Sequence, residues 1–111
     1  MIEFDVRTLD TGVGVVTPRG RLNMVAARQF KTILGDLVAE GTHRIVVDLA
    51  ETDFIDSSGL GALIGGVKQT RQQGGDLRIA RPTEGVMGVL ELTNLARVLR
   101  PRDAVDTAFD D

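Results

Sequence analysis

The stretch VVDLAETDFIDSSGLGALIGG, residues 46–66, contains the pattern that decides the fold of this 111-residue chain. Its apolar start continues the run from Arg44 to Leu49, which is typical of a strand buried on both faces. Its end carries apolar residues at helical spacing. Between them stand Ser57 and Ser58, the only serines of the chain, and four glycines follow within eight residues. The stretch therefore predicts a buried strand, a loop and a helix that begins at the serine pair.

The residues before this stretch predict two strands and a helix. Ile2, Phe4 and Val6 alternate with polar residues, which is the period of a half-buried strand. A second strand is expected over residues 13–19, where Pro18 indicates a sheet edge or a bulge. Asn23 is a good N-cap. The apolar face of the helix that follows Asn23 consists of Ala26, Ala27, Phe30, Ile33, Leu34, Leu37 and Val38.

The residues after the stretch predict further alternation of helices and strands. The serine helix should end at Gly74–Gly75, and a short strand is expected over Leu77–Arg81. Thr83 is a candidate cap for a third helix in TEGVMGVLEL. We expect a last strand over residues 98–100. A C-terminal helix, capped by Asp103, would carry Ala104, Val105, Ala108 and Phe109.

The expected order of elements is β-β-α-β-α-β-α-β-α. Strands that alternate with helices indicate an α/β fold with a largely parallel sheet and helices packed on it. The length favours one domain over residues 1–111. At this size some helices must cover one face of the sheet and leave the rest to solvent.

Composition limits the class of protein. Hydrophobic residues make up 42% of the chain, and the aromatic 4% is all phenylalanine, so the core must be aliphatic. The absence of cysteine excludes disulfides and cysteine metal sites and fits a cytoplasmic protein. The opening MIEFDVRTLD does not resemble a secretory signal, and no apolar run reaches the ~18 residues of a membrane span. With a net charge of −3 and no basic patch, nucleic acid is not an expected partner.

A nucleotide-binding interpretation of the glycines does not fit their context. Gly59, Gly61 and Gly65 resemble a dinucleotide fingerprint, but the fingerprint should follow its strand at once. Here residues 50–58 intervene, and the expected acid is missing from the end of the next strand. The chain also lacks the glycine–lysine–serine or glycine–lysine–threonine run of a P-loop.

A catalytic or metal-binding interpretation also lacks the necessary residues. Neither serine stands in a G-x-S-x-G context. The only histidine, His43, comes before the buried strand, whereas the serines come after it, so we expect roughly 17–20 Å between them. Asp53 and Asp56 have no further ligands near them in the sequence and are typical of acids at a helix start.

Two roles for the serine pair remain open from the residues alone. Asp56, Ser57 or Ser58 could cap the helix, because a side-chain oxygen can accept from a free backbone N–H. Alternatively, the helix start displays hydroxyls at a terminus that tolerates a phosphate. Glycine in a helix costs roughly 1 kcal/mol relative to alanine, so close backbone packing or a partner surface should compensate for Gly59 and Gly61.

The run IDSSGLG, within VVDLAETDFIDSSGLGALIG, resembles the signature of the STAS domain, in particular the bacterial anti-sigma factor antagonists. VTPRGRLN and LRIARPTEGVMGVLELTNL are similar to further parts of that family, so the resemblance spans nearly the whole chain. It implies a small α/β domain with a mixed, mostly parallel sheet of four to five strands and about four helices. It also implies a regulatory binding protein rather than an enzyme, with no catalytic residues, cofactor or metal.

The resemblance further implies a phosphorylation switch. In the family, a partner anti-sigma factor that is a serine kinase phosphorylates the second serine of the pair, and a phosphatase reverses this. That position is Ser58, with Ser57 as the alternative. The unphosphorylated protein would bind the anti-sigma factor and release the sigma factor, and a membrane or small-molecule partner is not expected. The expected partner-binding residues are Asn23, Asp56, Ser57, Ser58, Gly59, Leu60 and Gly61.

One position departs from the family pattern, and two other functions stay open. Many members carry an acid where this chain has Asn23, which keeps the capping ability but loses the charge. The first alternative function is a STAS scaffold or transporter-associated subunit that is never phosphorylated. The second is a small nucleotide-using enzyme, which is disfavoured because catalytic partners are missing.

Overall fold

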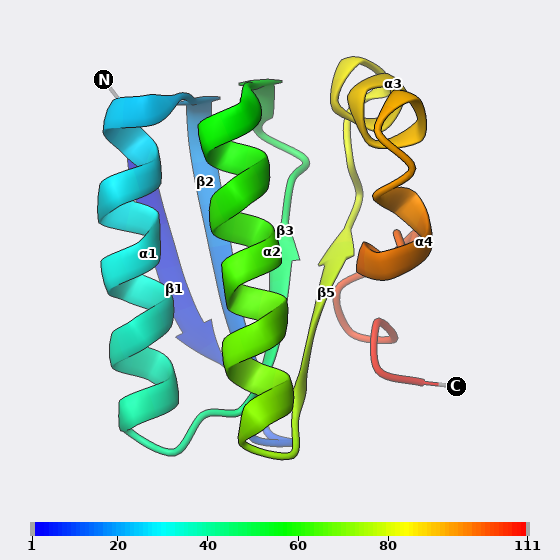
Figure 1. Ribbon diagram of the computed structural model, residues 1–111. Helices are drawn as coiled ribbons and strands as arrows, with labels where there is room; N and C mark the ends of the chain where they lie inside the picture. The colour runs from blue at the N-terminus through cyan, green and yellow to red at the C-terminus, as the bar shows by residue number, and fades with distance from the viewer. Residues whose placement is uncertain (1, 111) are drawn as a thin grey trace.

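A five-stranded sheet forms the framework of the protein in the computed structural model, which describes residues 2–110 (Figure 1). The strands are β1 (Glu3–Thr8), β2 (Gly14–Leu22), β3 (Arg44–Asp48), β4 (Thr52–Ile55) and β5 (Asp76–Ala80). The main path runs β1-β2-β3-β5, and β4 also pairs with β2. Only the β1–β2 pair is antiparallel; the other pairings are parallel. The expected α/β fold with a mixed, mostly parallel sheet is therefore confirmed.

The central strand β2 carries a proline because of where its two parallel partners meet. Val16 pairs with Val47 of β3, and Gly20 pairs with Thr52 of β4, so Pro18 lies between the two pairings. Proline has no N–H to donate, and at this point no partner strand requires one. The Pro18 carbonyl instead accepts from the Thr52 hydroxyl at 2.8 Å. Pro18 is thus not at a sheet edge, whereas the expected irregularity is present as a register shift between Gly20 and Arg21.

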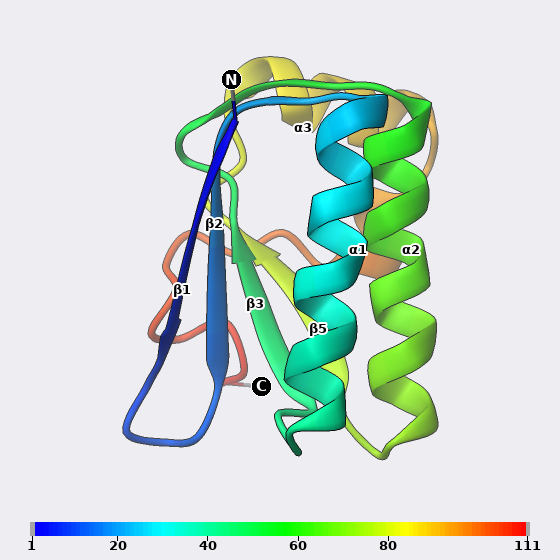
Figure 2. The same cartoon turned by 90° about the vertical axis from the view of Figure 1, so that its left-hand side faces the viewer.

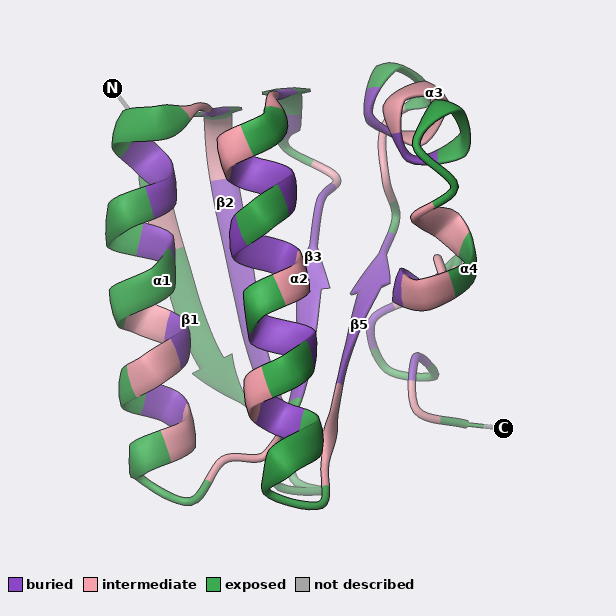
Figure 3. Ribbon diagram, in the orientation of Figure 1, coloured by how far each residue is buried: buried purple, intermediate pink, exposed green. Residues whose placement is uncertain are grey.

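Four helices accompany the sheet within the described residues, and the two long ones cover one of its faces (Figure 2). They are α1 (Met24–Ala39), α2 (Ser57–Gln72), α3 (Glu84–Leu92) and α4 (Ala96–Leu99). The sides of α1 and α2 that face the sheet are buried and their outer sides are exposed (Figure 3). The main core between them is almost wholly aliphatic, with Phe30 as its largest fully buried side chain. The expected α1 face and its stop at Gly41, where φ is +97°, agree with this arrangement.

The C-terminal segment covers part of the opposite face of the sheet and is not the expected helix. Residues 103–109 form bends and turns, and the expected strand at 98–100 falls mostly within α4. A seven-residue helix is marginal by itself, and tertiary contacts favour another conformation here. The Arg102 N–H donates to the Ile79 carbonyl at 3.0 Å, so the chain runs beside β5 instead. Val105 and Ala108 then bury against the sheet, in a second and smaller apolar cluster.

Phe109 fastens this segment to the sheet. Its ring lies between the guanidinium groups of Arg44 and Arg78, which are 4.7 and 4.6 Å from the ring centre. Arg78, itself buried, also donates to the Ala108 carbonyl at 3.1 Å. Stacking of arginine on an aromatic ring is favourable, and more so where water is excluded. The helices therefore cover one face of the sheet, and the C-terminal segment covers part of the other face, over β2, β3 and β5.

No helix in the described part of the chain is long and apolar enough to cross a membrane.

Candidate functional site

The start of α2 is capped by Asp56, so neither serine is its N-cap. The Asp56 carboxylate accepts from the Gly59 N–H at 3.0 Å, as an N-cap residue does. Ser57 and Ser58 are the first two residues of the helix, the former exposed and the latter half-buried. Neither hydroxyl makes a hydrogen bond within residues 2–110. Both serine side chains are therefore available for another purpose.

Removal of the cap should loosen the helix start. We expect Asp56→Ala to lower the free energy of unfolding by about 1 kcal/mol, because the Gly59 N–H loses its acceptor. Asp56→Asn is the matched control: asparagine caps equally well but removes the charge. Urea unfolding of the three proteins measures this. If the Asn variant were destabilised as much as the Ala variant, the charge of Asp56 rather than its capping bond would be the stabilising feature.

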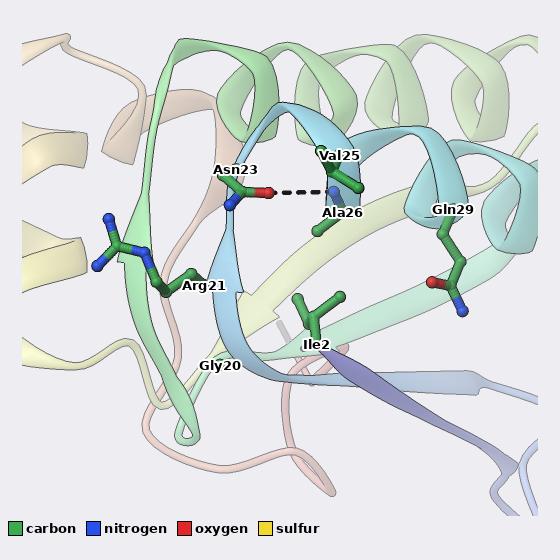
Figure 4. Close-up of a pocket in the computed structure, with 7 residues that line it drawn as sticks. All are labelled: Ile2, Gly20, Arg21, Asn23, Val25, Ala26 and Gln29. Atoms are coloured by element: carbon green, nitrogen blue, oxygen red, sulfur yellow. Dashed lines mark hydrogen bonds between the residues drawn. The ribbon is translucent and has the colours of Figure 1, made fainter.

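The N-terminal ends of α1 and α2 lie side by side at one end of the molecule (Figure 1). The backbone of Leu22 joins them, since its carbonyl accepts from the Asp56 N–H at 3.4 Å. The next residue, Asn23, caps α1 by accepting from the Ala26 N–H at 3.2 Å (Figure 4). Asn23 therefore has the capping role expected from the sequence, and it lies in the chain next to the residue that contacts the start of α2.

The three residues after the serines differ in burial. Gly59 and Leu60 are buried, and Leu60 is only 9% exposed. These two residues lie on the buried side of α2, so their contact with a partner stays a prediction. Gly61 is exposed, and a Cβ added to it would meet nothing within 4 Å. The exposed set is thus Ser57 and Gly61, with Asn23, Asp56 and Ser58 partly accessible.

Apolar side chains near this helix start are more exposed than is usual. Met24 and Val25, in the first turn of α1, are 61% and 76% exposed, and Phe54 of β4 is 36% exposed. The Arg21 guanidinium lies 4.1 Å from the centre of the Phe54 ring, so it shields part of that ring from water. Met24 and Val25 are adjacent, and neighbouring exposed apolar groups are a mark of protein-binding surfaces. Phe54 points to the other face of the sheet, because its neighbour Ile55 is buried in the core under the helices. Met24, Val25 and Phe54 are not among the residues expected at the site, although two apolar residues directly after the N-cap of α1 are a signal in the sequence.

A hollow of 320 Å³ adjoins this surface on the other side of Asn23. It is lined by Ile2, Gly20, Arg21, Asn23, Val25, Ala26 and Gln29 (Figure 4). Figure 4 shows the side chain of Arg21 extending away from Ile2 and Gln29, so its charge is not directed into the hollow. The surface at the start of α1 therefore contains a hollow as well as exposed apolar side chains.

Contacts with β3 and with the start of α3 hold the segment that leads to the serines in place. Asp48, at the end of β3, is nearly buried and pairs with Arg81, whose Nε lies 3.1 Å from a carboxylate oxygen. This hydrogen bond raises the pKa of Arg81 above its usual value, so the guanidinium keeps its charge. The Thr83 hydroxyl donates to the Thr52 carbonyl at 3.1 Å, which ties α3 to β4. These contacts fix the position of β4 and hence of the helix start that follows it.

The residues that the other chemistries would use are not brought together within residues 2–110. The carbonyl of His43 accepts from the Asp76 N–H at 3.1 Å, which places His43 at the end of the sheet away from the serines. Within residues 2–110 no three His, Asp or Glu side chains lie close enough together to hold a metal ion. The dinucleotide fingerprint was rejected because no strand precedes it directly. That reason is wrong, since β4 ends at Ile55, but Gly59 and Gly61 lie inside α2 rather than in the strand-to-helix turn that binds pyrophosphate.

The mixed sheet, the two helices on one face and the capped serine pair define a STAS domain. A model of that family matches residues 5–108, and the chain belongs to it. A Thermotoga maritima protein provisionally named an anti-sigma factor antagonist is 30% identical over 109 residues, which cover 97% of this chain and 96% of that protein. The anti-sigma-B factor antagonist of Staphylococcus epidermidis is 26% identical over 87 residues, covering 78% and 81%. By homology the protein groups with the anti-sigma factor antagonists.

Solved structures agree with this grouping. A Thermotoga maritima crystal structure with the same provisional name superposes with a TM-score of 0.88 at 30% identity, covering 96% of this chain and 92% of that chain. The phosphorylated form of SpoIIAA from Bacillus superposes with a TM-score of 0.76 and covers 97% of each chain. Its identity is 19%, so that likeness concerns the fold alone. The names of these relatives describe regulatory proteins and not enzymes.

Proposed function

We propose that the protein binds a kinase-type anti-sigma factor through the surface at the start of α2, and that phosphorylation of Ser58 ends this binding. The unphosphorylated protein would hold the anti-sigma factor and so free the sigma factor; a phosphatase would restore the binding form. The observation that supports the proposal most is that Asp56 caps α2, because this leaves the hydroxyl of Ser58 without a structural bond in the described chain.

The helix start can carry a phosphate without unfolding. Its first backbone N–H groups and the partial positive charge of the helix N-terminus favour an anion by roughly 0.3–1 kcal/mol. Asp53 and Asp56 lie close in the chain and oppose a phosphate that carries about −1.5 to −2 charges. The two effects are of similar size, so we expect the fold to persist and the change to act on binding.

Binding is sensitive to this charge because of the surface around it. A partner that covers Met24 and Val25 would exclude water from the neighbouring start of α2. A phosphate buried in such an interface without a cationic partner costs several kcal/mol. Local charge is thus sufficient for a switch, and no rearrangement of the sheet is required.

The test is phosphate mapping with the cognate kinase. The protein is incubated with the anti-sigma factor and Mg-ATP, and modified residues are located by mass spectrometry. We expect one phosphate on Ser58, and its loss in Ser58→Ala. Phosphate on Ser57 alone would move the switch to the alternative residue. A kinase that modifies a control substrate but neither serine would leave binding as the function and exclude the switch.

The alternative is a STAS scaffold or transporter subunit that is never phosphorylated. Under that function, a pull-down with the unmodified chain would recover a membrane permease or a scaffold complex. Recovery of a kinase-like anti-sigma factor would support the proposal instead. The exposed apolar residues at the start of α1 are compatible with either partner, so the identity of the recovered protein decides.

A further inference from the structure

Strand β1 forms one edge of the sheet, and no other described residue pairs with its outer side (Figure 2). The opposite edge, β5, is partly covered, because Ala80 forms a bridge with Arg102 of the C-terminal segment. Edge strands present unpaired N–H and C=O groups that can pair with another strand. Within residues 2–110, the chain thus covers part of the β5 edge and leaves the β1 edge unpaired.

The hydrogen bonds between β1 and β2 show which residues of β1 direct their backbone N–H and C=O groups away from the sheet. The Leu9 N–H donates to the Val13 carbonyl at 2.8 Å, and these two residues are opposite each other in the register of β1 and β2. Hydrogen-bonded pairs alternate along antiparallel strands. The odd-numbered residues of β1 therefore bond to β2, and the backbone groups of Phe4, Val6 and Thr8 face outward.

Strand β1 carries the charged side chains of Glu3, Asp5 and Arg7 but lacks the other usual protections of an exposed edge. Its register with β2 is unbroken from Glu3 to Thr8, and it contains no lysine, proline or bulge. Val6, at its centre, is 48% exposed and is one of the few large apolar side chains in contact with water. A regular strand with an apolar residue at its middle is suited to pairing with a further strand.

We propose that β1 pairs with β1 of a second copy of this chain, antiparallel and about a two-fold axis at Val6. In that register Val6 faces its own copy, and Phe4 faces Thr8. On the other face, Asp5 of each chain lies opposite Arg7 of the other, so both charged pairs are attractive. The outward backbone groups of the three even residues then form about six hydrogen bonds.

The sequence of β1 distinguishes this register from its neighbour. If the axis passed through Asp5 instead, the two Asp5 carboxylates would face each other across the strands, which is unfavourable. With the axis at Val6, no residue lies opposite a like charge. Asp5 already pairs with Arg19 of its own chain, and this contact keeps the carboxylate on the face where Arg7 of the second copy arrives. Charge and hydrogen-bond geometry thus favour the same dimer.

The dimer is tested by sedimentation velocity over a wide range of concentration. The chain has a mass of 11.9 kDa, and we expect its weight-average mass to approach twice that value as concentration rises. Val6→Arg places two like charges at the axis and should weaken dimerisation at least tenfold. Leu92→Arg is the matched control: Leu92 is 87% exposed and lies in α3, away from β1, so the same substitution there should leave the dimer intact.

A charge exchange provides a second test that does not depend on Val6. Asp5→Arg and Arg7→Asp should each be monomeric, because each homodimer would set like charges opposite each other. An equal mixture of the two variants should form a heterodimer, since both cross-strand pairs become attractive. Circular dichroism confirms that each variant is folded. A parent protein that stays monomeric up to millimolar concentration, or a dimer that neither Val6→Arg nor the charge variants affect, would overturn the proposal.

Discussion

Ser58→Asp is expected to weaken binding of the cognate anti-sigma factor by about 100-fold. A charge buried in the interface without a partner costs about 3 kcal/mol, and this free energy corresponds to a factor of about 100 in affinity. The Ser58 side chain is half-buried, so a docked partner would remove most of its remaining water. Thermal stability should change little, because an acid in the first turn of a helix is favourable. Isothermal titration with the purified anti-sigma factor measures the affinity.

Two variants control this prediction. Ser58→Ala should bind as the parent does, since the hydroxyl makes no hydrogen bond within the described residues. Ser57→Asp adds the same charge to the same helix start but at the more exposed position, where we expect a clearly smaller loss. Equal affinities for the parent and Ser58→Asp would contradict the charge mechanism. Equal losses in both Asp variants would show that the field of the added charge matters and not its burial.

Local signals in the sequence predicted much of the fold. Asn23 and Thr83 act as N-caps as expected, because an N-cap is decided by bonds within three residues. The apolar face of α1 follows directly from helical spacing. The resemblance to the STAS signature predicted the mixed sheet, and the family match confirms it.

The elements that the sequence did not predict depend on distant partners. Strand β4 is four residues long, and it exists because β2 offers a free edge beyond the end of β3. The C-terminal segment has helical spacing, but pairing with β5 and the contact of Phe109 with two arginines determine its path. Neither partner can be identified from the segment itself.

The same distinction applies to the candidate site. The sequence indicated a capped helix start with two serines but could not say which of three residues is the cap. Only the position of the Asp56 carboxylate relative to the Gly59 N–H decides this, and both serine hydroxyls then make no hydrogen bond within residues 2–110. The sequence likewise named Leu60 as a partner-binding residue, but it could not say that the contact of α2 with the sheet leaves only 9% of Leu60 exposed.

Gly59→Ala is expected to destabilise the protein by about 2–3 kcal/mol, a large effect for the addition of one methyl group. A Cβ at this position would lie 2.4 Å from the Leu22 carbonyl oxygen and 2.8 Å from a side-chain carbon of Ile55. The nearest of these atoms belongs to the backbone of β2, so α2 would have to move away from the sheet. That loss exceeds the roughly 1 kcal/mol gained when alanine replaces glycine in a helix. Urea unfolding measures the difference.

Gly61→Ala is the matched control, because it adds the same methyl group two residues later where nothing lies within 4 Å. Only the helix preference remains, and we expect a gain of about 0.5–1 kcal/mol. The two substitutions should therefore change stability in opposite directions, by roughly 3 kcal/mol in total. Close packing of α2 against β2 thus accounts for Gly59, but it does not account for Gly61. If Gly61→Ala also reduced binding of the anti-sigma factor while raising stability, a partner that approaches the helix closely would explain why glycine is kept there.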